Sequence, residues 1–171
     1  YGDRQLPEHK EKNYISYLRK FPLFPDFNQV EIERLVVRRA YPLHPVTLAL
    51  LPSVSSLFGQ NERTLFTFLE SYQSGGLMNF VSRYDGAYTP ANLFDYVFTN
   101  IDEIELEEGF EELNLYQKLL KKIPNLMDCH LAVLKFITLW NITGFQAKYP
   151  LTSDLIAFAL DYDESEIEAF L

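Results

Sequence analysis

Hydrophobic residues recur every three or four positions along most of the chain, which predicts helices. In residues 7–21, Tyr14, Leu18 and Phe21 follow this spacing with charged residues between them. Prolines and glycines separate later segments of the same kind. These segments are residues 28–40, 45–59, 60–72, 76–86, 89–101, 115–123, 126–144, 152–160 and 163–171. Strand patterns are nearly absent, so the sequence predicts an all-α fold, an irregular multi-helix bundle.

Polar residues that typically cap helices stand at several of the predicted helix starts. They are Asn28, Thr152 or Ser153, and the pair Asp163 and Glu166. Prolines also fall at favoured first-turn positions. The predicted helix boundaries therefore have a local chemical basis as well as a periodic one.

The segment Asp102–Glu112 holds seven acidic residues and no basic ones, and Lys118, Lys121 and Lys122 follow it. Acids near the start and lysines near the end of a helix complement its dipole. This pattern favours a solvated helix over an acidic ligand site. Residues 126–144 are apolar nearly all round, which predicts a buried central helix.

The chain carries 24 acidic and 15 basic residues, a formal net charge of -9. This balance argues against a surface devoted to nucleic acid or to an anionic membrane. The single cysteine, Cys129, excludes an internal disulfide and a cysteine-based metal site and favours a cytoplasmic location. No apolar run approaches the roughly 18 residues that a membrane span needs. Because the chain starts without Met and ends within an apparent helix, we expect it to be part of a longer protein.

The sequence lacks the motifs of several common enzyme classes. There is no G-x-x-x-x-G-K-[ST] loop for a triphosphate, no G-x-G-x-x-G, no H-E-x-x-H and no G-x-S-x-G. The three histidines, His9, His44 and His130, do not have the spacing of a metal site. We therefore predict no catalytic residue and no metal, and expect that the chain is not an enzyme by itself.

Residues 38–71, "RRAYPLHPVTLALLPSVSSLFGQNERTLFTFLES", hold the most distinctive pattern in the chain. This stretch resembles a motif block of large multidomain P-loop ATPases of bacteria and archaea, of the AAA+/STAND type. The resemblance is specific in "YPLHP" and "GQNERTLF" and continues more loosely through "GGLMNFV" and "TPANLFDYVF". The tail, from "LAVLKFITLWNITG" to "ESEIEAFL", resembles the three helices of a winged-helix unit without its wing.

The resemblance, which covers residues 38–171, implies a non-catalytic helical lid and adaptor segment that follows an ATPase core. Such a segment couples the nucleotide state to partners or downstream domains, while ATP and Mg²⁺ bind to the parent protein. We expect a lid-like domain in residues 1–101 and an acidic helix with a winged-helix-like unit in residues 102–171, or one continuous domain. The implied partners are the ATPase core and other protein domains, and many such proteins serve defence or DNA maintenance.

The triplet Asn61-Glu62-Arg63 has two compatible interpretations. In the structural one, Asn61 caps the following helix, Glu62 lies at the positive end of its dipole and Arg63 pairs with a nearby acid. In the functional one, implied by the resemblance, Arg63 reaches toward the phosphates held by the ATPase core. The planar, permanently charged guanidinium suits that task.

The segment that begins at Arg38 and Arg39 also has a functional and a structural interpretation. Either arginine is an alternative candidate for the phosphates. "YPLHP" is expected to form a rigid turn that walls an adenine, with Tyr41 or His44 near the base; its structural alternative is a plain connector between helices.

A function from another class stays open, a stand-alone α-helical protein–protein interaction module without a nucleotide role. The last predicted helix, "ESEIEAFL", carries no lysine or arginine. Because phosphate contacts need cations, direct DNA binding by this segment is not expected. A partner protein suits the tail better.

Overall fold

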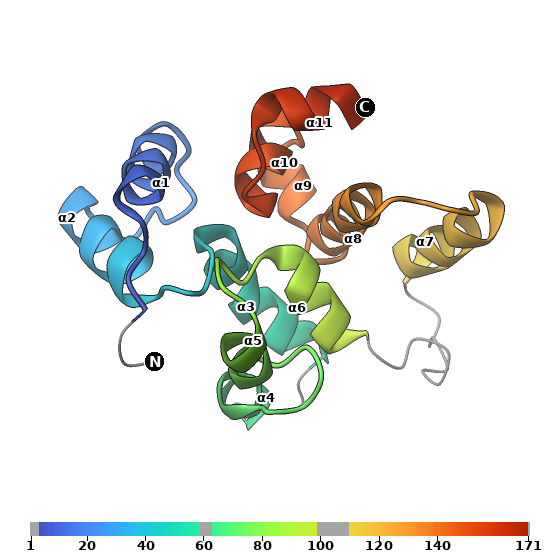
Figure 1. Cartoon of the computed structure of the whole chain (residues 1–171), viewed down its shortest axis with the longest axis horizontal. Helices are drawn as coiled ribbons and strands as arrows, with labels where there is room; N and C mark the ends of the chain where they lie inside the picture. The colour runs from blue at the N-terminus through green and yellow to red at the C-terminus, as the bar shows by residue number, and fades with distance from the viewer. Residues whose placement is uncertain (1–3, 59–62, 99–109, 171) are drawn as a thin grey trace. The chain divides into compact units, whose positions relative to one another are not determined.

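The structure, a computed structural model, describes residues 4–58, 63–98 and 110–170 (Figure 1). Within these ranges the chain forms helices and no β-strand, which confirms the predicted all-α class. The chain divides into two compact units, Tyr1–Thr89 and Pro90–Leu171. The domain boundary predicted between residues 101 and 102 lies outside the described residues.

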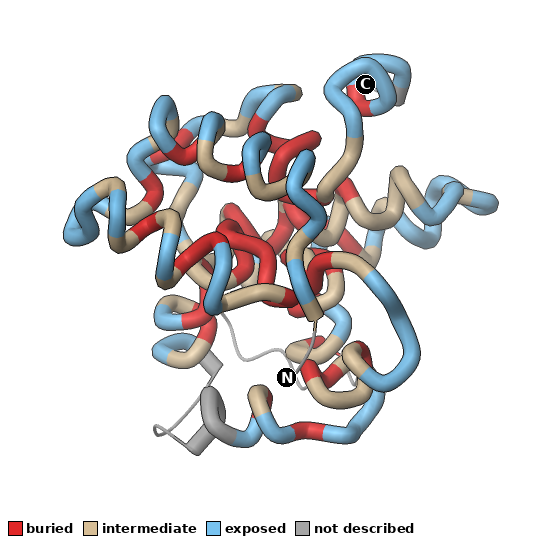
Figure 2. The backbone as a smooth tube through the Cα atoms, turned by 60° about the vertical axis from the view of Figure 1, so that its left-hand side comes forward, coloured by how far each residue is buried: buried red, intermediate tan, exposed pale blue. Residues whose placement is uncertain are grey.

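The first unit is a series of helices, each packed on an earlier one. The elements are α1 (Glu8–Lys20), α2 (Gln29–Glu31), the π-helix η1 (Ile32–Arg39), α3 (Pro45–Phe58), α4 (Arg63–Glu70) and α5 (Leu77–Arg83). Helix α1 packs on η1, η1 on α3, α3 on α4, and α4 on α5. Buried residues recur along one side of the helices, as amphipathic patterning requires (Figure 2).

The start of α2 confirms the cap predicted at Asn28. Its Oδ1 accepts a 3.0 Å hydrogen bond from the Glu31 amide, and Glu31 Oε2 accepts one of 2.9 Å from the Asn28 amide. This reciprocal pair is a capping box. The chain then widens into η1, which the amide of Ala40 closes by bonding to the carbonyl of Leu35, five residues earlier, at 3.1 Å.

The winding of η1 changes which residues face the core. An α-helical spacing places Ile32, Leu35 and Val36 on one face. In the structure Ile32, Val36 and Val37 are buried, while Leu35 is half-buried. The wider turn therefore moves Val37 into the core, which the periodic pattern did not predict.

The carbonyl of Ser71 caps the first turn of helix α5. That oxygen accepts hydrogen bonds from the amides of Met78 at 3.1 Å and Asn79 at 3.3 Å. Gly76 lies against the same residue, and a Cβ added to it would stand 2.6 Å from the Ser71 carbonyl oxygen. The glycine thus permits a close approach that any other side chain would obstruct.

The second unit is built around one long helix. Its elements are α6 (Pro90–Val97), α7 (Glu111–Lys122), α8 (Asp128–Ile142), α9 (Phe145–Lys148), α10 (Ser153–Leu160) and α11 (Glu164–Phe170). Helix α8 packs against α6, α7, α9 and α10, and α11 packs against α10. This confirms the prediction of a central helix within residues 126–144.

The burial of α8 is uneven along its length. Phe136, Leu139 and Trp140 are fully buried, whereas Leu134 is only half-buried. The indole Nε1 of Trp140 donates a 2.8 Å hydrogen bond to the Tyr149 carbonyl, which satisfies its only polar group. The buried residues of α8 therefore concentrate between Phe136 and Trp140, and the helix is not buried all round.

The structure has part of the capping predicted in the tail. The Thr152 hydroxyl accepts a hydrogen bond from the Leu155 amide at 3.4 Å and so caps α10. Glu166 Oε2 accepts a 3.0 Å hydrogen bond from the Asp163 amide at the start of α11. Asp161 joins the two helices with a left-handed backbone, φ 61°. No helix in the described ranges is both long enough and apolar enough to cross a membrane.

Candidate nucleotide-proximal site

The candidate site lies in the first unit, at the turn from η1 into α3. Tyr41 and Pro42 are joined by a cis peptide bond, and the Leu43 amide bonds to the Ala40 carbonyl at 2.8 Å. The turn is held on its other side by Tyr88, whose amide bonds to the Pro42 carbonyl at 2.7 Å. "YPLHP" thus forms a turn that main-chain hydrogen bonds fix to the distant segment around Tyr88.

Tyr88 anchors this turn deep in the core of the unit. Its carbonyl accepts hydrogen bonds from the His44 amide at 3.0 Å and the Thr47 hydroxyl at 2.8 Å. Its ring is fully buried and meets the rings of Phe68 and Phe80 edge-on, at centroid distances of 5.4 and 5.2 Å. Packing on both sides of the turn therefore limits its movement.

His44 is a buried part of this framework. Its side chain is fully buried, and its Nδ1 accepts a 3.2 Å hydrogen bond from the Val46 amide at the start of α3. Its ring lies edge-on to Tyr14 of α1, with centroids 4.8 Å apart. The imidazole thus acts as a helix cap and a core residue in this conformation.

Tyr41 is half-buried and borders an open pocket on the same unit. The pocket has a volume of about 330 Å³, and its lining is Arg4, Gln5, Pro7, Lys10, Tyr41, Asp85 and Gly86. This volume lies at the lower end of the range for small-molecule sites, roughly 300–1,000 Å³. The lining thus sets an aromatic ring beside two cations, Arg4 and Lys10, and one anion, Asp85.

Arg4 fixes one wall of the pocket. Its guanidinium donates hydrogen bonds to the carbonyls of Tyr84, at 2.6 Å, and of Val81, and lies 3.6 Å from Asp85 Oδ1. These carbonyls end α5, where the helix dipole favours a positive charge. Gly86, which follows Asp85, turns the chain with a positive φ of 101°. A Cβ added there would meet open space. Arg4 thus connects the segment before α1 to the pocket wall formed by Asp85 and Gly86.

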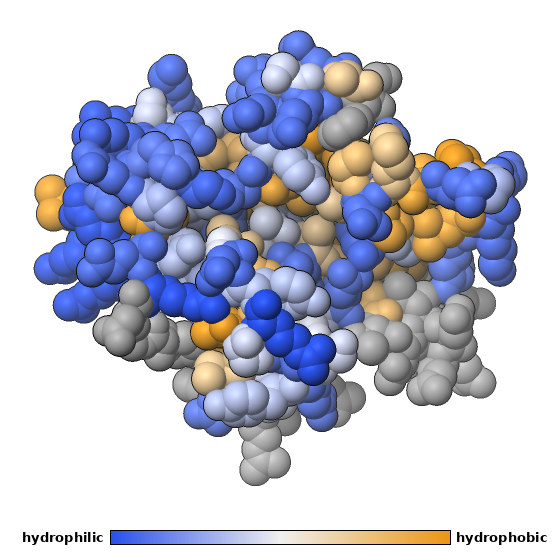
Figure 3. Space-filling view, in the orientation of Figure 1, coloured by the Kyte–Doolittle hydropathy of each residue, from blue (hydrophilic) through white to orange (hydrophobic). Residues whose placement is uncertain are grey.

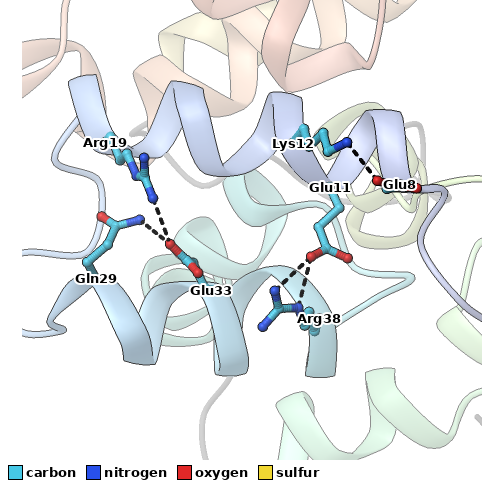
Figure 4. A network of polar contacts seen from close by, with 7 residues as sticks. All are labelled: Glu8, Glu11, Lys12, Arg19, Gln29, Glu33 and Arg38. Carbon is cyan, nitrogen blue, oxygen red and sulfur yellow. Dashed lines mark hydrogen bonds and ion pairs between the residues drawn. The ribbon is translucent and has the colours of Figure 1, made fainter.

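Arg38 and Arg39, at the end of η1, have different surroundings. Arg38 pairs with Glu11 of α1, since Glu11 Oε1 lies 2.9 Å from both its Nε and its Nη2 (Figure 4). Arg39 is exposed. Of the two, Arg39 is therefore the arginine that can reach toward an added group without breaking the ion pair with Glu11.

A second polar cluster holds the other end of the same two helices. Glu33 Oε1 of η1 accepts hydrogen bonds from Gln29 and Arg19, both at 3.1 Å (Figure 4). The hydrogen bond from Gln29 and then the one from Arg19 hold the pKa of Glu33 below its ordinary value of 4.5. Together with the pair of Glu11 and Arg38, the cluster fixes η1 along α1.

The remaining predicted residues bear on the site less directly. Arg63 is the first residue of α4, and its side chain lies outside the described residues, as do Asn61 and Glu62. Their roles as phosphate contact and helix cap stay predictions. Among the described residues, no group of three or more His, Cys, Asp or Glu could hold a metal ion. Cys129, in the second unit, is a half-buried free thiol.

Most of the pocket was not anticipated from the sequence. Tyr41 was predicted as a wall, but Arg4, Lys10, Asp85 and Gly86 were not. Arg4 and Tyr84 are 80 positions apart, so no periodic or local pattern links them. Gly86 ends the predicted segment 76–86, and nothing in the sequence indicated which segment faces it.

The chain matches no family, no curated protein and no solved structure.

Proposed function

We propose that the chain is a non-catalytic helical lid and adaptor segment of a larger P-loop ATPase, and that the Tyr41 pocket meets the nucleotide base. The observation that carries the proposal is the position of Tyr41, beside Arg4 and Lys10 on an open pocket of about 330 Å³. A tyrosine ring offers a stacking surface to any base, and Lys10 adds a cation to the same lining, while Arg4 is paired with Asp85. Sequence resemblance in "YPLHP" and "GQNERTLF" supports the same function.

The framework around Tyr41 supports a role in transmitting a conformational change. The residues before Tyr41 belong to η1, which two sets of polar contacts hold along α1. The residues after Pro42 pair with Tyr88 and enter α3 through His44. A ligand that displaced Tyr41 would therefore act on three helices, as an adaptor segment requires.

Arginine is the residue that would act on the phosphates. Arg63, at the start of α4, and Arg39, exposed at the end of η1, are the two candidates. Either would approach the phosphates from the helical side while the P-loop of the parent protein supplies the main phosphate cradle and Mg²⁺. Such an arginine acts on charge that develops in the transition state, so its loss affects turnover more than binding.

One genomic observation tests the proposal at low cost. The reading frame that encodes residue 1 is extended upstream and searched for G-x-x-x-x-G-K-[ST] after a predicted strand. The proposal expects this loop in the same protein. A complete open reading frame without it would leave the interaction-module alternative as the better account.

In the protein that carries the P-loop, Arg63→Ala and Arg39→Ala are measured for melting temperature and ATP turnover on the same preparations. Loss of one surface charge costs about 0–1 kcal/mol of stability. Loss of a phosphate-directed arginine is expected to lower turnover by about 10³-fold or more. Arg38→Ala serves as the matched control, because Arg38 is held by Glu11. Unchanged turnover in both test variants would contradict the phosphate role.

A further inference from the structure

Helix α7 of the second unit presents an exposed apolar stripe. Leu115, Leu119 and Ile123 follow one another at four-residue spacing, so they lie along one side of the helix and its end. Leu115 is 58% exposed and Ile123 is 46% exposed, while Leu119 is half-buried. Met127, 56% exposed, follows shortly after the helix. Hydrophobic residues gather visibly over α7 (Figure 3).

Within the stripe, Leu115 points away from the side by which α7 packs into its own unit, whereas Ile123 projects within about 20° of the buried Tyr116. Leu113 and Tyr116 are buried, and Tyr116 contacts Phe94 of α6 with ring centroids 4.9 Å apart. At about 100° per residue, Leu115 points roughly 160° away from Leu113 around the helix axis. Contiguous exposed apolar surface of this kind marks an interaction site more often than single exposed side chains do.

The charges beside the stripe are ordered along the helix. Glu111, Lys118 and Lys122 project within about 40° of one another, next to Leu115. All three are exposed, with the acid in the first turn and Lys122 in the last. Glu111 and Lys122 are eleven positions apart, which is about 16 Å along the axis.

The charges along this flank of α7 are complementary to those of a second α7 that runs in the opposite direction. In an antiparallel pair of identical helices related by a two-fold axis, the same flank meets itself in opposite direction. Glu111 of one helix then lies near Lys122 of the other, and the reverse contact also forms. In the same register Leu115 of one helix faces Leu119 of the other. A parallel pair would instead set this flank against the opposite flank of the partner helix, so the Glu111–Lys122 pairs would not form.

We propose that α7 is a self-association surface, and that a second copy of this chain binds it as an antiparallel helix. The apolar stripe forms the centre of the contact, and two Glu111–Lys122 pairs form its ends. Charged rims set orientation while buried apolar residues supply most of the affinity. The proposal goes beyond the nucleotide site, which lies in the other unit, and neither depends on the other.

Sedimentation velocity of the 171-residue chain over a range of concentrations tests the proposal. The chain is measured at physiological ionic strength, where screening over about 8 Å limits repulsion between two chains of charge -9. A monomer–dimer equilibrium is expected. Leu115→Glu should weaken dimerisation by about tenfold or more, because it places a charge in the apolar centre. Val30→Glu, at an apolar residue of α2 that is 70% exposed, is the matched control and should leave dimerisation unchanged.

Charge exchange tests the orientation. Glu111→Lys alone, and Lys122→Glu alone, should each weaken dimerisation, because each sets like charges against one another. The double variant Glu111→Lys with Lys122→Glu should restore it to within a few fold of the original, since the antiparallel pairs reform with reversed sign. Circular dichroism checks that each variant keeps its helix content.

Three results would overturn the proposal. The first is a chain that stays monomeric at every concentration. The second is a Leu115→Glu variant that dimerises as well as the unmodified chain. The third is a double charge variant as weak as the single ones, which excludes the antiparallel arrangement.

Discussion

Glu11 Oε1 lies 2.9 Å from both Nε and Nη2 of Arg38, so one carboxylate oxygen of α1 holds the guanidinium at the end of η1. Tyr41 follows Arg38 by three positions, at the edge of the pocket. The ion pair therefore connects α1 to the segment that positions Tyr41. Arg38 was one of the residues expected near phosphate, and in the structure its charge is already matched.

We predict that Arg38→Ala leaves the fold nearly unchanged. The Arg38 side chain is 53% exposed, and solvent screens most of its interaction with Glu11. Exposed pairs of this kind contribute about 0–1 kcal/mol. Urea unfolding of the variant should therefore give a free energy within about 1 kcal/mol of the original chain. A loss of several kcal/mol would show that the pair is a main support of η1.

Two leucines of α8 provide a matched test of the second core. Leu139 is fully buried and Leu134 is half-buried, although both belong to the same helix. Leu139→Ala should cost about 2–5 kcal/mol through lost burial and the cavity left behind. Leu134→Ala should cost clearly less, because solvent already reaches part of its side chain. Chemical denaturation of both variants measures the difference, and equal losses would contradict the packing described for α8.

Tyr116 gives the second unit a specific response to alkaline pH. Burial, and secondly the nearby Asp95, raise the pKa of Tyr116 to about 12 from its ordinary value of 10.0. The folded chain thus keeps this proton over a pH range in which the unfolded chain releases it, and stability falls as pH rises from about 10 to 12.

The variant Tyr116→Phe isolates this effect, since it removes the proton and keeps the ring. Denaturation of both chains near neutral pH and at strongly alkaline pH should show a smaller loss of stability for the variant. Equal losses in the two chains would mean that another group sets the alkaline limit.

Features that depend on neighbouring residues were predicted well from the sequence. The cap at Asn28 and the proline starts of α3 and α6 follow from short-range chemistry, and the structure has them. The central position of α8 follows from its apolar composition. The π-helix was not predicted, because its wider turn departs from the α-helical spacing on which the prediction rested.

The candidate site likewise has features that the sequence predicted and features that depend on long-range contacts. Tyr41 could be singled out because "YPLHP" belongs to the stretch that resembles an ATPase motif block. His44 belongs to the same motif, yet its role as a buried cap depends on Tyr14 from another helix. The pocket walls depend on Arg4 reaching residues 81 and 84, a long-range contact that periodicity does not encode.

The central claim, that the Tyr41 pocket meets a nucleotide base, is tested most directly by titrating ATP into the isotopically labelled 171-residue chain and following backbone NMR shifts. Without a P-loop, binding should be weak, with a Kd of about 1 mM or higher, and no ATP should be hydrolysed. Shift changes should concentrate at Lys10, Tyr41 and Gly86. They should vanish in Tyr41→Ala and persist in Tyr72→Ala, which alters a tyrosine of the same unit that is 70% exposed. No change at these residues, or the same response in both variants, would contradict the account.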